Sequence, residues 1–192
     1  MNKLIYIDVE TTGLSAKRND IIQLAGIIEI DKEVVDYFNI RVQPHNYANI
    51  EQAALNVNKR TVEEIKTFQS PREAYKDFTS LLSKYINKFD KNDKAYMIAY
   101  NGRFDLEFLH EWFIKCGDKY FGSFFNWRVI DPIQMVDWMQ LKGALTLTDR
   151  KLETLCEYFG IELDAHDAMR DIEATRELTQ KLLEVIEILP WE

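Results

Sequence analysis

Three apolar runs near the start of the chain, separated by short polar links, place the strongest constraint on its fold. The runs cover Leu4 to Val9, Ile21 to Ile30 and Val34 to Val42, and all three are rich in β-branched residues. The link Asp31-Lys32-Glu33 is short enough to join antiparallel neighbours. The pattern therefore predicts three strands that pair antiparallel within one sheet.

Shorter apolar runs farther along the chain predict two more strands, Ala95 to Ala99 and Val129 to Ile130. The expected helices cover 51–66 (short helices with a break near Asn58), 71–89 with Ser70 as the cap, 104–115, 132–141, 148–159 and 168–188. The longest irregular stretch is expected between Gly117 and Trp127. This order of elements predicts an α/β fold: a mixed five-stranded sheet with its first three strands antiparallel and helices on both faces.

Length and composition favour one ordinary domain, expected over residues 1–192. A hydrophobic content of 46% is enough for a packed core and too high for a disordered chain. No apolar run reaches membrane-spanning length and the first residues do not form a signal peptide, so we expect a soluble, cytoplasmic protein without a membrane partner. Cys116 and Cys156 have no metal-binding spacing and are expected as reduced thiols.

The net charge of −8 argues against a protein that coats nucleic acid through a broad basic surface. It does not exclude an enzyme that acts on nucleic acid. A cluster of metal-binding acids lowers the net charge, and the bound metal then supplies the positive field locally.

Asp8 and Glu10 end the first apolar run, and they are the residues most informative about function. Alternate residues of a strand point to the same face, so both carboxylates are aimed at one spot. Neighbouring carboxylates repel each other, and a divalent cation such as Mg²⁺ or Mn²⁺ removes that penalty. A strand end with two solvated acids is the alternative interpretation of this pair.

Two further segments of the sequence carry acids that are considered together with Asp8 and Glu10. Tyr100-Asn101-Gly102-Arg103-Phe104-Asp105 directly follows the expected strand 95–99, and His166-Asp167-Ala168-Met169-Arg170-Asp171 leads into the last helix. Together, DVETTGL, YNGRFDLEFL and HDAMRD resemble, in order and separation, the three motifs of the DEDDh 3′→5′ exonucleases. These enzymes belong to the DnaQ-like superfamily, whose fold is similar to RNase H. ALNVNKRTVEEI and KLETLCEYFGI are also similar to segments of that family.

The resemblance implies a set of catalytic residues. Asp8, Glu10, Asp105 and Asp171 are implied as ligands of two Mg²⁺ or Mn²⁺ ions, and His166 as the general base. A related branch has Tyr four residues before the last acid, where this chain has Asp167, so the histidine branch is the match. Four carboxylates can hold two such ions, and a neutral imidazole can take a proton near neutral pH.

Substrate contacts are expected at the first two motifs. The resemblance implies that Thr11 and Thr12 meet the 3′-terminal nucleotide and that Leu14 packs against its base. Gly13 would allow close backbone approach. The remaining candidates are Asn101 (or simply a turn residue), Phe104, and the aromatic residues Phe124, Phe125 and Trp127, which would either stack on bases or pack in the core.

The expected activity is removal of nucleoside 5′-monophosphates from single-stranded 3′ ends. DNA and RNA both remain open as substrates, and a polymerase or repair complex is a candidate partner. The alternative from another class is a catalytically silent module that binds a nucleic-acid end or a polymerase. An RNase H-like internal cutter is a further alternative, which the histidine of the third motif disfavours.

Overall fold

A computed structural model describes residues 2–163 and 168–188. Its centre is a five-stranded sheet in the order β3-β2-β1-β4-β5. The strands cover Lys3–Thr11 (β1), Ile21–Ile30 (β2), Glu33–Arg41 (β3), Ala95–Ile98 (β4) and Phe125–Ile130 (β5). β1, β2 and β3 pair antiparallel, whereas β4 runs parallel to both β1 and β5. The predicted fold class, including the three antiparallel strands, is confirmed.

The helices follow the predicted order. They cover Gln52–Asn58 (α1), Val62–Ile65 (α2), Pro71–Tyr85 (α3), Arg103–Lys115 (α4), Pro132–Leu141 (α5), Leu152–Phe159 (α6) and Ala168–Ile188 (α7). Ser70 caps α3 through a reciprocal capping box with Glu73, as its position before Pro71 predicts. Among the described residues, no helix is long and apolar enough to cross a membrane.

Three predicted boundaries are wrong. Helix α3 ends at Tyr85 rather than near Phe89, because Ile86 turns to an extended conformation and is buried in the core. Helix α6 begins at Leu152 rather than Thr148, after a turn in which Asp149 accepts hydrogen bonds from Lys151 N and Thr154 Oγ1. The stretch expected to be irregular contains a short 3₁₀ helix, Phe121–Ser123, and the beginning of β5.

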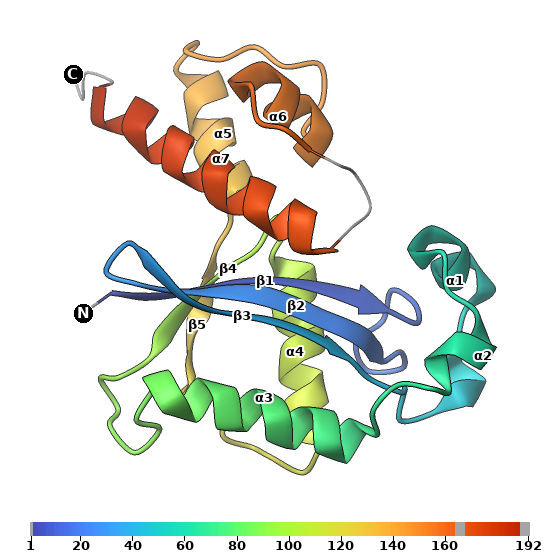
Figure 1. Ribbon diagram of the computed structural model, residues 1–192. Helices are drawn as coiled ribbons and strands as arrows, with labels where there is room; N and C mark the ends of the chain where they lie inside the picture. The colour runs from blue at the N-terminus through green and yellow to red at the C-terminus, as the bar shows by residue number, and fades with distance from the viewer. Residues whose placement is uncertain (1, 164–167, 189–192) are drawn as a thin grey trace.

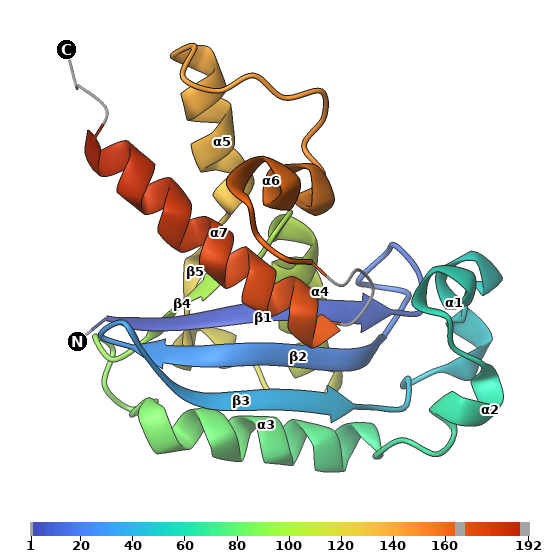
Figure 2. The same cartoon turned by 45° about the horizontal axis from the view of Figure 1, so that its top comes forward.

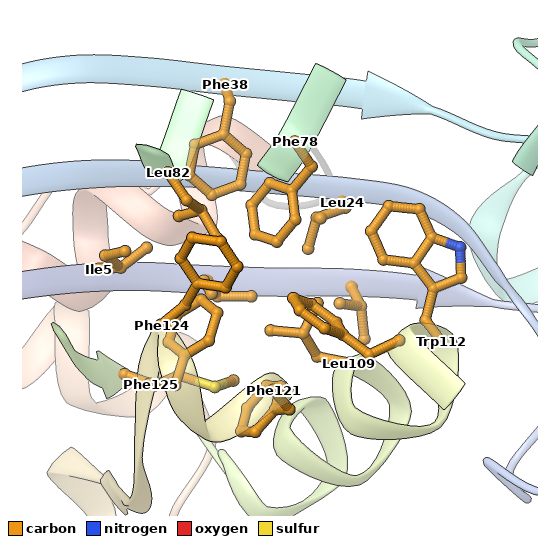
Figure 3. Close-up of a cluster of buried hydrophobic side chains, with 14 of the residues drawn as sticks. Ile5, Leu24, Phe38, Phe78, Leu82, Leu109, Trp112, Phe121, Phe124 and Phe125 are labelled. Carbon is orange, nitrogen blue, oxygen red and sulfur yellow. The ribbon is translucent and has the colours of Figure 1, made fainter. Parts of the chain in front are cut away.

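Helices α3 and α4 cover one face of the sheet, with an aromatic core between them and the strands (Figures 1 and 3). Phe78 of α3 lies at its centre, with its ring centroid 5.4 Å from that of Phe38 and 6.5 Å from that of Phe125. Phe113 of α4 meets Phe78 and Phe121 edge to face. This dense packing fixes α4, and with it Asp105, relative to β1.

Helix α7 crosses the opposite face, together with α5 and α6 (Figures 1 and 2). Tyr6 of β1 packs with Ile172 of α7 on this side, whereas Ile5 and Ile7 point into the aromatic core. The alternation of side chains along β1 therefore puts Asp8 and Glu10 on the face that α7 covers.

An ion pair anchors α7 to the sheet. Arg176 Nε donates to Glu29 Oε2 of β2 over 2.7 Å, and the Glu29 side chain is only 4% exposed. Helix α7 therefore docks through a buried charge as well as through its apolar side chains.

Candidate active site

Asp8 and Glu10 lie near the end of β1, where the antiparallel pairing with β2 continues. Asp8 stands opposite Ala25 and Glu10 opposite Gln23, and the register shifts between Glu10 and Thr11. Both carboxylates belong to the face of the sheet on which α7 lies, so the prediction from the two-residue period of a strand is met.

Asp105 reaches the same strand from the other side of the molecule. The parallel pairing between β1 and β4 ends at Tyr6 and Ile98, so the later part of β1 has no strand neighbour there. Asp105, in the first turn of α4, occupies this place, and its Oδ1 accepts a hydrogen bond from Val9 N at 3.0 Å. The residue is 4% exposed, which makes it a buried acid bound to the backbone between Asp8 and Glu10.

The turn between β4 and α4 is shaped by close backbone contacts. A Cβ on Gly102 would lie 2.6 Å from Val129 Cγ2 and 2.8 Å from Ala99 O, so this position requires glycine. Asp131 accepts hydrogen bonds from the backbone N–H groups of Asn101 and Gly102 and also caps α5. Asp131 therefore has a structural role at the junction of this turn and α5.

Asp171 comes from the first turn of α7. It lines a cavity of about 110 Å³ together with Asp8, Tyr6, Tyr100 and Leu152. Figure 2 shows the first turn of α7 and helix α1 on either side of the end of β1, and both helices contact this strand. Three separate parts of the chain thus bring acids to one end of β1.

The electrostatics of the four acids show that they share one environment. Burial raises the pKa of Asp8 well above its usual value, and the charges of Asp105, Glu10 and Asp171 raise it further. Burial also raises the pKa of Glu10, with Asp171 adding to the effect. The pKa of Asp105 is raised by burial, then lowered in part by its hydrogen bond from Val9. Asp8, Glu10 and Asp105 are thus each harder to ionise than a solvated carboxylate.

The donor set fits a hard divalent cation, because carboxylate oxygens are the ligands that Mg²⁺ and Mn²⁺ prefer. A cation among these acids would also relieve the mutual repulsion that raises their pKa values. In the geometry of the described residues, no three His, Cys, Asp or Glu side chains stand close enough to hold one ion. The fit therefore rests on donor chemistry and shared charge.

His166, the expected general base, lies outside the described residues, as do Asp164 and Asp167. Helix α7 begins at Ala168, two residues after His166 in the sequence.

The predicted substrate contacts of the first motif lie in a tight turn. Thr11 Oγ1 donates to Gly13 O over 2.7 Å, and Thr12 Oγ1 accepts from Asp20 N over 2.9 Å. Both threonine side chains thus already hold the turn in shape. Leu14, by contrast, is 83% exposed and is available to a base.

Gly13 is required by the packing of the protein itself. A Cβ on Gly13 would lie 2.3 Å from Nδ2 of Asn19, which is buried and donates to Asn49 O. The group that lies against Gly13 is therefore the side chain of Asn19. From the sequence alone, the substrate is expected in this place.

The aromatic residues predicted to contact bases differ in how exposed they are. Phe125 and Phe124 are at most 2% exposed and belong to the core, so the prediction that Phe125 stacks on a base is wrong. Phe104 is half-buried against Phe108, with ring centroids 4.6 Å apart. Trp127 is 58% exposed and keeps the surface position that stacking requires. Asn101 has φ of 56°, which is the conformation of a turn residue.

Arg60 is a residue near the site that sequence reasoning missed. Its charge lowers the pKa of Glu10, against the effect of burial. The segment ALNVNKRT carries a family-like pattern, but nothing within it marks one residue, because Arg60 and Glu10 meet only in the folded chain.

Comparison with known proteins gives a consistent result. The model of the exonuclease family named RNase T matches residues 5–179. The chain is 30% identical over 183 residues to a PolC-type DNA polymerase III from Oceanobacillus iheyensis, covering 94% of this chain but only 11% of that protein. It is 28% identical over 185 residues to ribonuclease T from Vibrio parahaemolyticus, covering 91% of this chain and 82% of that protein.

Solved structures agree on the fold. Exonuclease I from E. coli in complex with a dA16 oligonucleotide aligns with a TM-score of 0.74 at 19% identity, over 96% of this chain and 41% of that one. The cell-death related nuclease CRN-4 aligns with the same TM-score at 15% identity, over 96% of this chain and 64% of that one. Since the family model spans nearly all of the strands and helices described above, this chain belongs to the exonuclease family that the model describes.

Proposed function

We propose that the protein is a metal-dependent 3′→5′ exonuclease of the DEDDh type, acting as a single domain on single-stranded ends. The observation that carries the proposal is the convergence of Asp8, Asp105 and Asp171 from three elements, with Glu10 beside them, in one environment where the charges of the other three acids raise the pKa of Asp8. Like charges that gather at one place repel one another, so four acids at one end of β1 favour a functional role over a structural one.

In this mechanism each acid has a distinct support. Asp8 and Glu10 are fixed by the pairing of β1 with β2, and Asp105 by its hydrogen bond from Val9 N. Asp171 is carried by α7, which the ion pair between Arg176 and Glu29 holds on the sheet. Asp8, Glu10, Asp105 and Asp171 would hold two divalent ions, which would activate a water and stabilise the charge that develops on the phosphate. His166 then takes the proton of the attacking water.

The substrate is proposed to be single-stranded DNA or RNA, released as nucleoside 5′-monophosphates. The relatives support both: the PolC-type proteins are DNA polymerases, and ribonuclease T is named for RNA. The exposed Leu14 gives the terminal base an apolar surface beside the acids. Because the PolC-type relatives are DNA polymerases, a polymerase is a candidate partner.

The test is a gel assay with 5′-labelled single-stranded DNA and RNA, in Mg²⁺ or Mn²⁺. Asp8→Ala is expected to abolish a ladder that shortens from the 3′ end. Asp77→Ala, which removes an acid on α3 on the far face of the sheet, is the matched control and should cut as the wild type does. A wild type that binds oligonucleotides in either metal but never shortens them would instead favour the silent binding module.

A circular single strand separates the remaining alternative. An exonuclease leaves it intact because the circle has no end, whereas an internal cutter opens it. A 3′-blocked linear strand of the same sequence is the companion substrate, and its degradation would contradict the proposed direction.

A further inference from the structure

Arg60, in the link between α1 and α2, is a basic residue whose charge acts on one of the acids, Glu10. Its guanidinium forms an ion pair with Glu64, and its Nη2 donates to Gln23 Oε1 at 3.2 Å. Gln23 is held in turn, because its Nε2 donates to Asn39 Oδ1 over 2.9 Å. Two fixed acceptors on different elements therefore define where the guanidinium lies.

That position is beside Glu10. Gln23 is the residue directly opposite Glu10 in the pairing of β1 with β2, and opposite side chains of such a pair have their Cβ atoms about 5 Å apart on the same face. Arg60 contacts Gln23, so it lies at the rim of the acid cluster on the side of α1. The lowering of the pKa of Glu10 by Arg60 agrees with this geometry.

The backbone under Arg60 is also fixed. Asn58 Nδ2 donates to Thr11 O over 2.9 Å, which ties the link to the end of β1. Arg60 N donates to Leu55 O, and Lys59 closes α1 in the left-handed conformation with φ of 52°. Thr61 then caps α2 by accepting from Glu64 N. The guanidinium is thus presented from a rigid link, as a substrate-binding group should be.

Three facts suggest what this arginine binds. The Arg60 side chain is 23% exposed, so the group reaches solvent at the rim. A guanidinium carries five N–H donors, more than the contacts to Glu64 and Gln23 use. The chain has a net charge of −8, so a strand that approaches these acids needs local positive charge along its backbone.

We propose that Arg60 binds a backbone phosphate of the nucleic-acid strand whose 3′ end lies at the acid cluster. Arginine suits this role because its planar fork matches phosphate oxygens and stays charged at all working pH values. The inference rests on the proposed function, since it takes the strand to enter at the end of β1.

Binding measurements separate this role from a structural one. Fluorescence anisotropy of a 5′-labelled single-stranded oligonucleotide is recorded over a range of salt concentrations, with Ca²⁺ in place of Mg²⁺ and the strand verified as uncut on a gel. Each phosphate contact to a single strand contributes about 0.7 to the slope of log K against log salt concentration. Arg60→Gln should therefore flatten the slope by about 0.7 and weaken binding about fivefold at 0.1 M salt.

Two variants act as controls. Arg60→Lys keeps the charge and should keep the wild-type slope, and melting temperatures establish that both Arg60 variants are folded. Arg41→Gln removes the same charge from β3, opposite Gln23 on the far side from Glu10, and should leave the slope unchanged.

An unchanged slope in Arg60→Gln, or an equal loss in Arg41→Gln, would overturn the assignment of the contact while leaving the exonuclease intact. A wild type that neither binds nor shortens any single strand would overturn the proposed function, and this inference with it.

Discussion

The ion pair between Arg176 and Glu29 makes a quantitative prediction about how α7 is held. Glu29 is 4% exposed at its side chain, and Arg176, which is 24% exposed, donates to it over 2.7 Å. Arg176→Met keeps most of the packing of the side chain but removes the charge. It leaves a buried carboxylate without its partner, which typically costs about 3–5 kcal/mol.

The loss is measured by urea unfolding. For a chain of this length it corresponds to a fall in melting temperature of roughly 6 to 20 °C. The double variant Glu29→Gln with Arg176→Met should recover most of the stability, because the destabilising feature is the unpaired charge and not the missing arginine.

The same variants report on the site. Since Asp171 lies on the same helix as Arg176, about one and a half turns before it, the single variant should also require more metal for half-maximal activity. A loss of less than about 1 kcal/mol, the range of an exposed ion pair, would refute the reasoning that this pair is buried and holds α7 in place. Arg170→Met, which removes an exposed partner of Glu173, is the control for a surface pair and should change stability little.

Three further predictions concern single residues. Asp8→Asn should melt at or above the wild-type temperature in EDTA at pH 8, because the raised pKa of Asp8 means that ionising it costs folding free energy. This advantage should shrink as the pH falls and vanish below about pH 4, where the wild-type carboxyl becomes protonated in the unfolded state as well. The pKa of Asp93 is lowered by hydrogen bonds from Lys3 and Asn87, so the stability it contributes is present above about pH 4 and lost as the pH falls through its lower folded-state pKa. Asp93→Asn should therefore show a flatter acid limb in a plot of melting temperature against pH, and an unaltered limb would contradict it. Phe125→Leu should lower the free energy of unfolding by about 1–3 kcal/mol without changing the Kd for an oligonucleotide, and weakened binding in the folded variant would restore its stacking role.

The sheet was predictable because its information is local. The runs that became β1, β2 and β3 each carry their own strand pattern, and Asp31 and Lys32 of the polar link form a tight turn that leads into β3 at Glu33. The end of α3 was not predictable in this way, because Ile86 leaves the helix to fill the core. The beginning of β5 was missed for a related reason: its first residue, Phe125, follows a 3₁₀ turn and owes its place to distant partners such as Phe78.

In the candidate site, too, the features set by local sequence were predictable and those set by contacts between distant residues were not. The shared face of Asp8 and Glu10 follows from the period of a strand, and the convergence of Asp105 and Asp171 on β1 is the arrangement that the family motifs imply. Aromatic residue type does not tell a core ring from an exposed one, which is why Phe125 and Trp127 looked alike. Arg60 could not be found from the sequence, since its contact to Gln23 joins residues that are far apart in the chain.

Where the pairing of β4 with β1 ends, one backbone amide of β1 can serve as a spectroscopic probe of the acid cluster. Beyond Tyr6, the amide of Val9 donates to a side chain where a continuing strand would have offered a carbonyl. The ¹⁵N–¹H resonance of this amide should follow the ionisation and movement of Asp105. A spectrum of labelled protein would then register occupation of the acid cluster through a backbone atom, with neither substrate nor turnover required.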